Sequence, residues 1–352
     1  MTGKERVLAA VNHKCADRTP ITFDAEIEVY ASLYEHFGIK SKKKLFDLLN
    51  VDTWMLLPGG FDNTSTDVPG EKESIWGFKT TEAQYSGGVY DEINYWPLAG
   101  KDSLDEIDKW AAPSIDQIDF SGFCEEAKTY QDRAIIGVFT HGPYFIATDL
   151  RGLEGVMMNF ALNRKYAHKL IDKISQSVFG YLDNMLENYG NGIDIVYMAD
   201  DYCSQRSPLF SPADFKEFVV PYLTDIAQRV HKHNKKFLLH CCGAVRPLLP
   251  MIIEAGVDML EPIQIRAEGM EPAALKRDFG KDLCFYGGLD LQEVLCKSSP
   301  QQVSDEVKRL IDILGKDGGY ILGPGHTYIQ VDAPVENIIA MYDTAASYGK
   351  TG

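Results

Sequence analysis

An imidazole and a thiol stand two residues apart at His240 and Cys242, directly after the lysine-rich and apolar run 235–239. Such a run is typical of a β-strand, and in a strand residues i and i+2 point to the same side. Imidazole nitrogen and thiolate sulfur are both ligands that Zn²⁺ prefers. A hydrogen-bonded structural histidine and a core cysteine would also explain the pair taken alone. The pair therefore predicts half of a zinc site, whose other ligands must come from elsewhere in the chain.

The elements that would position this pair alternate along the whole sequence. Short apolar runs have the composition of β-strands, and helical patterns separate most of them. The runs cover residues 19–23, 53–57, 134–140, 194–198, 236–240, 258–261, 283–286 and 319–322. Eight strand–helix units in 352 residues favour an α/β fold of the closed (β/α)8 TIM barrel type over an open doubly wound sheet. No Gly-x-Gly-x-x-Gly turn follows the first run, which weakens the dinucleotide-binding form of that alternative.

One segment does not fit a simple barrel. Residues 59–98 are rich in glycine, threonine, tyrosine and tryptophan and show little helical periodicity. We interpret them as an inserted hairpin excursion after the second strand, near the barrel mouth. The sequence predicts a single barrel domain over residues 1–352, since no low-complexity linker divides it.

The functional groups of such a barrel lie at the C-terminal ends of its strands. Polar or titratable side chains follow seven of the eight predicted strands, and the candidates are Asp24, His141, Asp201, Tyr202, His240, Cys242, Glu261, Gln264, Asp290 and His326. His326 is predicted as the third metal ligand, because three nitrogen or sulfur ligands and one open position match a catalytic zinc site. Glu261 or Asp201 would be a fourth ligand, or an outer partner that fixes a histidine tautomer.

Composition and charge narrow the class of protein. Hydrophobic residues make up 45% and charged residues 24%, and no apolar run approaches the roughly 20 residues that span a bilayer. The first residues have no apolar signal-peptide core, so we expect a cytoplasmic protein whose seven cysteines are thiols or ligands. The net charge of −16, without a lysine and arginine stripe, argues against nucleic acid as a partner.

Several stretches resemble the uroporphyrinogen decarboxylase superfamily. They are 5–10 (Glu-Arg-Val-Leu-Ala-Ala), 17–20 (Asp-Arg-Thr-Pro), 211–212 (Ser-Pro), 218–221 (Phe-Val-Val-Pro), 240–243 (His-Cys-Cys-Gly), 285–290 (Phe-Tyr-Gly-Gly-Leu-Asp) and 334–338 (Pro-Val-Glu-Asn-Ile). The resemblance follows the chain in order over nearly its whole length. It implies a (β/α)8 barrel, monomeric or homodimeric, with its site at the C-terminal mouth.

The resemblance implies one of two chemistries. True uroporphyrinogen decarboxylases need no metal, and an arginine-rich motif after their first strand, of the form Arg-Gln-Ala-Gly-Arg, holds the carboxylates of the substrate. Here residues 23–28 read Phe-Asp-Ala-Glu-Ile-Glu, which is acidic. A substrate with eight carboxylates would meet repulsion where it needs arginine forks. This departure argues against the reaction that gives the superfamily its name.

The other branch comprises zinc methyltransferases that move a methyl group between a corrinoid and a thiol. They resemble this chain in the His-x-Cys pair, and their third ligand is a cysteine in a late Pro-Gly-Cys turn. Here the turn reads Pro324-Gly325-His326. The resemblance therefore implies a zinc ion held by His240, Cys242 and His326, with cobalamin as co-substrate on a separate corrinoid protein. The change from cysteine to histidine makes the site less electron-rich and leaves the methyl acceptor open.

These observations favour a zinc-dependent methyltransferase in which Glu261 or Asp201 exchanges a proton. The residues predicted to bind the substrate are Asp24, His141, Tyr202, Gln264 and Asp290. One alternative is a metal-free decarboxylase of a tetrapyrrole or another carboxylated ring. A further alternative is a non-catalytic module that binds a corrinoid or a tetrapyrrole.

Overall fold

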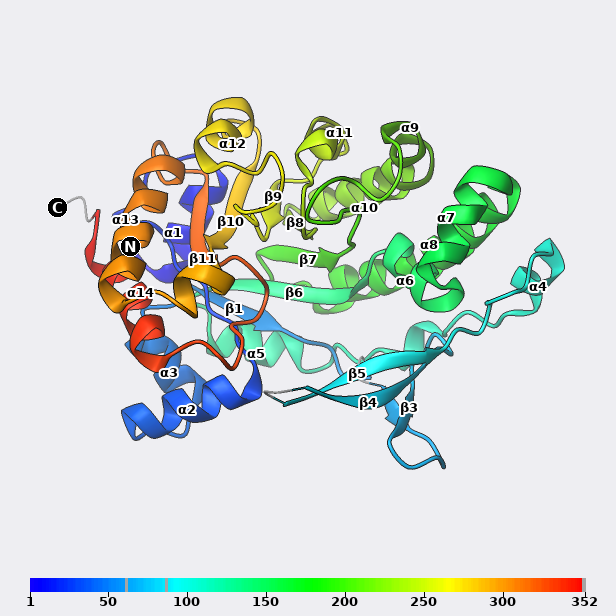
Figure 1. Cartoon of the computed structure of the whole chain (residues 1–352), viewed down its shortest axis with the longest axis horizontal. Helices are drawn as coiled ribbons and strands as arrows, with labels where there is room; N and C mark the ends of the chain where they lie inside the picture. Colours follow the sequence, from blue (N-terminus) through cyan, green and yellow to red (C-terminus); the bar gives the residue numbers. More distant parts are fainter. Residues whose placement is uncertain (61–62, 86–87, 350–352) are drawn as a thin grey trace.

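A computed structural model of the chain describes residues 1–60, 63–85 and 88–349. Its centre is a curled parallel sheet of seven strands in the order β1-β6-β7-β8-β9-β10-β11, with helices along its outer side (Figure 1). The strands are β1 (Thr53–Leu56), β6 (Ala134–His141), β7 (Ile195–Ala199), β8 (Lys236–His240), β9 (Met259–Glu261), β10 (Cys284–Leu289) and β11 (Tyr320–Pro324). Seven of the eight strands predicted from the sequence are therefore regular strands, and the fold class is α/β.

Side chains alternate between two faces of this sheet. Ile136, Tyr197 and Leu238 belong to one buried cluster, to which α1 (Gly3–Val11) adds Val7. Their neighbours along the strands belong to a larger cluster that packs against the surrounding helices. Strands that are buried on both faces have continuous apolar sequences, and this is why they could be predicted from the sequence. The same alternation carries the side chains at the strand ends to a common edge.

Besides α1, the helices lie before, between and after the strands along the chain. They are α2 (Ile27–Phe37), α3 (Lys42–Leu48), α4 (Leu104–Lys109), α5 (Phe123–Thr129), α6 (Pro143–Arg151), α7 (Leu153–Leu162), α8 (Arg164–Asn184), α9 (Pro212–Asp214), α10 (Val220–Lys232), α11 (Leu249–Glu254), α12 (Pro272–Phe279), α13 (Pro300–Leu314) and α14 (Val335–Ser347). Capping boxes start α1 at Thr2 and α13 at Ser299. Within the described ranges, the helices are too short or too polar for a membrane span.

The first predicted strand, residues 19–23, is not a regular strand, and this corrects the closed eight-stranded barrel. Ile21 forms an isolated parallel bridge with Leu322 of β11, and its carbonyl accepts a hydrogen bond from Asp52 N, next to β1. The segment thus links the two edge strands. Its ladder is incomplete because Pro20 has no N–H, and because the Ile21 N–H donates to the Asp52 carboxylate at 2.8 Å.

Part of the predicted excursion 59–98 forms a separate antiparallel sheet of four strands, in the order β2-β3-β4-β5. Its strands are β2 (Thr64–Ser65), β3 (Glu71–Glu73), β4 (Lys79–Tyr85) and β5 (Gly88–Tyr95). Figure 1 shows β4 and β5 running beside each other below the main sheet. Residues 61–62 and 86–87 of this segment lie outside the described residues.

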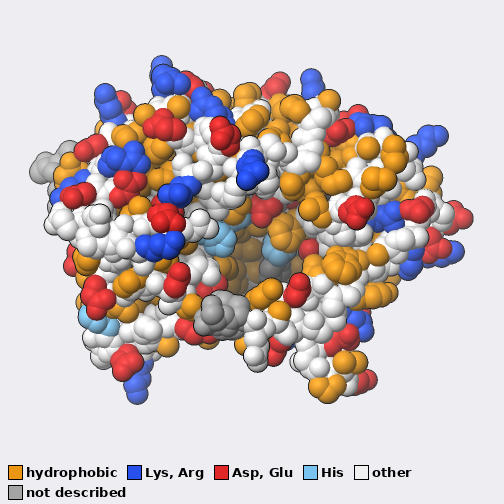
Figure 2. Space-filling view, in the orientation of Figure 1, with side chains coloured by type: hydrophobic (Ala, Val, Ile, Leu, Met, Phe, Trp, Pro, Cys, Tyr) orange, Lys and Arg blue, Asp and Glu red, His pale blue; other side chains and the backbone are white. Residues whose placement is uncertain are grey.

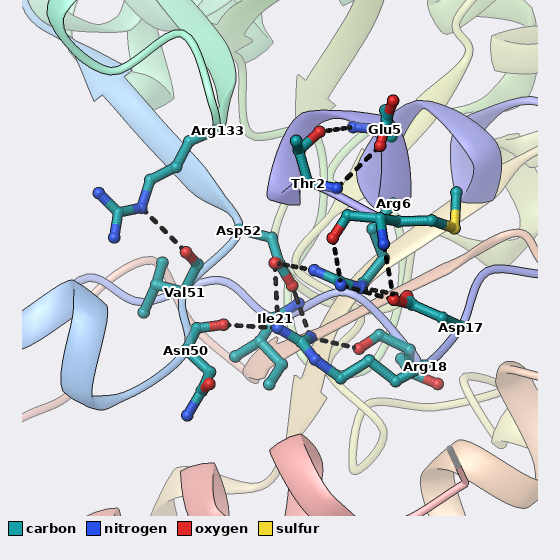
Figure 3. A network of polar contacts seen from close by, with 12 residues as sticks. Thr2, Glu5, Arg6, Asp17, Arg18, Ile21, Asn50, Val51, Asp52 and Arg133 are labelled. Atoms are coloured by element: carbon teal, nitrogen blue, oxygen red, sulfur yellow. Dashed lines mark hydrogen bonds and ion pairs between the residues drawn. The ribbon is translucent and has the colours of Figure 1, made fainter. Parts of the chain in front are cut away.

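A buried ion-pair network holds the N-terminal ends of the strands (Figure 3). The Asp52 carboxylate accepts hydrogen bonds from Arg6 Nη1 at 2.6 Å and from Arg18 Nη1 at 2.6 Å. Arg6 also donates to Asp17 through Nε at 2.6 Å. Asp52 is 2% exposed, so these charges are compensated by one another rather than by water. In a barrel this end serves stability, which leaves the opposite end for chemistry.

Candidate metal centre

Three potential metal ligands meet where β7 and β8 end. The register of the two strands pairs Ala199 with His240, which brings Asp201 beside Cys242. The Nε2 atom of His240 lies 3.4 Å from Cys242 Sγ and 3.6 Å from Asp201 Oδ1. These three ligand atoms all lie within 4.8 Å of one another. The predicted His-x-Cys pair therefore does share one side of the sheet edge, and Asp201 joins it.

The donor set fits a zinc ion in chemistry and in spacing. A tetrahedral zinc holds nitrogen at about 2.1 Å and sulfur at about 2.3 Å, which puts two such ligands about 3.5 Å apart. The distances of 3.4 Å and 3.6 Å from His240 Nε2 match this separation. The backbone N–H of Cys242 donates to Asp201 Oδ1 at 2.7 Å, which fixes the carboxylate next to the thiol. His240, Cys242 and Asp201 could therefore hold one Zn²⁺ ion.

Glu261 fixes the orientation of the His240 ring. The register between β8 and β9 pairs the two residues, and Glu261 Oε2 lies 2.5 Å from His240 Nδ1. The hydroxyl of Thr327 adds contacts of 3.1 Å to His240 Nδ1 and 3.3 Å to Glu261 Oε1. A metal-binding histidine commonly donates its second N–H to a carboxylate in this way, which leaves Nε2 for the metal. Of the two roles predicted for Glu261, this contact matches that of a partner that fixes the histidine tautomer.

The pKa values of His240 and Cys242 depend on the residues around them. Burial opposes a charge on His240, but the Glu261 carboxylate and Cys242 outweigh it and raise the pKa of His240 well above its usual value. Burial also raises the pKa of the Cys242 thiol, although His240 acts in the opposite direction. The chain alone therefore favours a protonated thiol. A bound cation would reverse this preference, because a metal-coordinated thiol loses its proton.

His326 does not join the group that Asp201, His240 and Cys242 form within the described residues. Its Nδ1 atom accepts a long hydrogen bond of 3.4 Å from Tyr328 N. His326 also lines each of two cavities that are described below. Burial and the charge of His240 lower the pKa of His326. The third member of the group is Asp201, which the sequence analysis offered as a fourth ligand or an outer partner, and the role of His326 as a ligand stays a prediction.

Of the adjacent Asp200 and Asp201, only Asp201 faces the group. Asp200 is fully buried and accepts hydrogen bonds from Tyr202 Oη at 3.0 Å and Tyr222 Oη at 2.7 Å. Burial raises the pKa of Asp200 to about 7 despite these bonds. Tyr202 is itself 0% exposed, and its predicted role in substrate binding stays a prediction. Its ring belongs to the core because successive residues after β7 point in opposite directions.

The other predicted substrate residues surround the group at different distances. Gln264 touches it directly, since its Nε2 donates to Cys242 Sγ at 3.4 Å. Burial, aided by the charge of His240, lowers the pKa of His141 to about 4. Asp24 accepts a hydrogen bond from Tyr30 Oη at 3.0 Å and lines a small cavity beside Glu261.

Asp290 lies farther along the mouth. Its carboxylate accepts from Gln292 N at 3.0 Å, which caps the turn that follows β10, and pairs with Arg266 Nη1 at 3.4 Å. It lines a cavity together with Gln264 and His326. Asp290 is thus held in place by two partners and faces the same space as Gln264.

Comparison with known proteins places the chain in a family. The family described as uroporphyrinogen decarboxylase (URO-D) matches residues 103–348, well over half of the chain. The protein belongs to the uroporphyrinogen decarboxylase family. A methylated-thiol–coenzyme M methyltransferase of Methanosarcina mazei is 26% identical over 220 residues, which cover 61% of this chain and 54% of that enzyme. A uroporphyrinogen decarboxylase of Alcanivorax borkumensis is 25% identical, with 92% of this chain and 91% of that enzyme covered.

The fold of this URO-D family member is shared with a solved relative. A methyltransferase structure from Methanosarcina mazei has a TM-score of 0.72 at 20% sequence identity, and the match covers 99% of each chain. At this identity the likeness concerns the fold. The relatives are named as enzymes of two kinds, methyltransferases and decarboxylases. The residues of the site are therefore the evidence that can distinguish between these two activities.

Two cavities flank the metal group of this URO-D family member. The smaller holds about 20 Å³ and is lined by Asp24, Lys42 and Glu261, while the larger holds about 350 Å³ and is lined by Gln264 and Asp290. His326 lines both. Figure 2 shows the molecule hollowed near the middle of this face, with histidine side chains in the hollow. The smaller cavity has room for about one water molecule, so the larger of the two is the candidate space for a substrate.

Sequence reasoning missed several residues of this neighbourhood. Thr327 was overlooked although it follows His326 directly, because a threonine carries no metal-site signal of its own. Gln205, Arg266 and Gln330 line the larger cavity from three different loops. A closer reading of the residues just after each strand end would have included them as candidates.

Proposed function

We propose that this URO-D family member is a zinc-dependent methyltransferase that moves a methyl group between a small substrate and a corrinoid carried by a separate protein. The observation that carries the proposal is the group formed by His240 Nε2, Cys242 Sγ and Asp201 Oδ1, with Glu261 on the second nitrogen of His240. The corrinoid partner is proposed from the family resemblance alone. A cytoplasmic location and a monomeric or homodimeric state are part of the proposal and rest on the sequence and on the family resemblance.

Zinc bound here would supply a Lewis acid that lowers the pKa of a substrate thiol or hydroxyl. The protein's own residues provide the frame. Glu261 and Thr327 hold the His240 ring, and Gln264 donates a hydrogen bond to Cys242 Sγ. Asp201, with 35% of its side chain exposed, is the carboxylate of the group that reaches solvent. We assign the positioning of His240 to Glu261, and proton exchange with the substrate to the oxygen of Asp201 that would not bind the metal.

The proposal includes a single barrel domain over residues 1–352 with the excursion 59–98 near its mouth. Two contacts at the ends of the excursion support it. Gly59 forms an antiparallel bridge with Asp119, and Leu98 N donates to Leu150 O at 2.8 Å. Both ends of the segment therefore contact residues of the chain outside the excursion.

Metal-free decarboxylation is the second candidate, because the match to the Alcanivorax borkumensis decarboxylase covers 92% of the chain. The residues after the first predicted strand oppose it. Asp24 and Glu26 stand where the arginine-rich motif would lie, and residues 23–28 contain no arginine to form a fork with carboxylates. Release of CO₂ from uroporphyrinogen by purified protein would favour this candidate over methyl transfer.

Metal analysis of purified protein tests the first proposal. We expect about one zinc ion per chain in the unchanged protein, and loss of this zinc in Cys242→Ser. Cys124→Ser is the control and should keep its zinc, because the exposed Cys124 is far in sequence from His240, Cys242 and Asp201. X-ray absorption should show one sulfur ligand. A chain that binds no zinc, or that keeps full methyl transfer after chelation, would contradict the proposal.

A further inference from the structure

The cavity of about 350 Å³ beside the metal group carries information about the substrate. Four of its lining residues are glutamines, Gln205, Gln264, Gln292 and Gln330. Primary amides both donate and accept hydrogen bonds without carrying charge. With four of its ten lining residues glutamines, this wall is suited to hydroxyl, ether and amide groups rather than to ions.

Gln264 joins this cavity to the proposed metal group. Its Nε2 donates to Cys242 Sγ at 3.4 Å, while its Oε1 accepts from Gly243 N at 2.9 Å and from Gln205 Nε2 at 2.5 Å. These bonds fix the direction of the amide. Gln264 therefore lies between a molecule in the cavity and the sulfur of Cys242.

The charges of the cavity cancel one another. Arg266 and Asp290 are its formally charged lining residues besides His326, and they form an ion pair of 3.4 Å. No lysine is among the lining residues that the structure describes. With a net charge of −16, the protein as a whole also repels anions. An anionic substrate would thus find no uncompensated cation at this place.

Two amides of the wall keep hydrogen-bonding capacity for a ligand. Gln330 Nε2 has only long bonds, of 3.4 Å to Glu26 Oε1 and 3.3 Å to Tyr328 O. Within the described part of the chain, no hydrogen bond reaches Oε1 of Gln330 or Gln292. Both residues line the cavity, so their amide oxygens are available to accept from hydroxyl groups.

We infer that the substrate is an uncharged polar molecule with several hydroxyl, ether or amide groups, of on the order of fifteen non-hydrogen atoms. This inference rests on the proposed function for the role of that molecule in methyl transfer. An octacarboxylate tetrapyrrole fits neither the volume of about 350 Å³ nor the balanced charge. The cavity therefore argues against a tetrapyrrole substrate for this chain.

Calorimetric titration of the full zinc-loaded chain with matched probes tests the inference. One pair is methyl β-D-glucopyranoside and methyl β-D-glucopyranosiduronate, and the other is 3-methoxypropane-1,2-diol and 3-methoxy-2-hydroxypropanoate. In at least one pair the uncharged member should bind at least tenfold more tightly. Gln330→Leu and Gln292→Leu should weaken that binding about tenfold, whereas Gln228→Leu, an exposed position on α10, should not.

Equal or tighter binding of the anionic members, no binding of either pair, or insensitivity to both cavity substitutions would overturn the inference. Melting curves of the variants exclude loss of folding as the cause of a weakened titration. Zinc content measured on the same samples separates the two proposals. A zinc-loaded chain without the preference overturns only the substrate class. A preference for uncharged probes in a chain that takes up no zinc supports the substrate class and contradicts the metal centre.

Discussion

Replacing Glu261 by glutamine removes one negative charge from the metal centre and changes little else. The carboxylate is 3% exposed, and its Oε2 lies 2.5 Å from His240 Nδ1. A glutamine Oε1 can still accept from Nδ1–H, and its amide can still meet the Thr327 hydroxyl, which lies 3.3 Å from Glu261 Oε1. The ring orientation is therefore preserved while the charge that makes the imidazole a stronger ligand is lost.

Because only the outer carboxylate changes, we expect zinc affinity to fall about 10- to 100-fold. This loss corresponds to roughly 1.4–2.7 kcal/mol. Cys242→Ser removes a ligand of the group itself and should cost more than Glu261→Gln. The variant with the larger loss of zinc affinity thus identifies the residue that binds the metal, and the variant with the smaller loss identifies the residue that orients the His240 ligand.

Competition with a chromophoric chelator measures the zinc affinity of both variants. Glu254→Gln is the matched control, since Glu254 is exposed on α11 and distant from the group in the fold. An unchanged affinity in Glu261→Gln would refute the argument that this carboxylate supports the ligand. A loss as large as that of Cys242→Ser would show that Glu261 binds the metal directly.

Further predictions follow from other parts of the molecule. Asp52→Asn leaves two buried guanidinium groups undercompensated and should lower the free energy of unfolding by about 3 kcal/mol in urea titrations, so an unchanged midpoint would contradict the network's role. His326→Ala should keep its zinc, because His326 lies outside the group; zinc loss equal to that of Cys242→Ser would return it to the ligand set. Burial raises the pKa of Asp149 to about 8, so the folded chain binds a proton that the unfolded chain has released. Stability should therefore fall as pH rises from about 4 to about 8, by at most about 1.4 kcal/mol per pH unit, and Asp149→Asn should flatten this slope in denaturant titrations at several pH values.

Local patterns in the sequence determined most of the architecture. Strands buried on both faces are continuous apolar runs, so seven of them could be located, with 236–240 matching the bounds of β8. The pairing of His240 with Cys242 also followed from the sequence alone, because the period of a strand puts residues i and i+2 on one side. Glu261 was found because it is the last residue of the next strand along the chain, and functional groups of such folds lie at the C-terminal ends of strands.

Only the tertiary structure decided which side chains complete the site. The register that sets Ala199 against His240 brings Asp201 to Cys242, and no local pattern specifies a register between strands far apart in sequence. Packing after β7 turns Tyr202 inward, and the loop after β11 brings Thr327 rather than His326 onto the His240 ring. Periodicity fixes directions within a strand, whereas the loops beyond the strand ends take their conformation from long-range contacts.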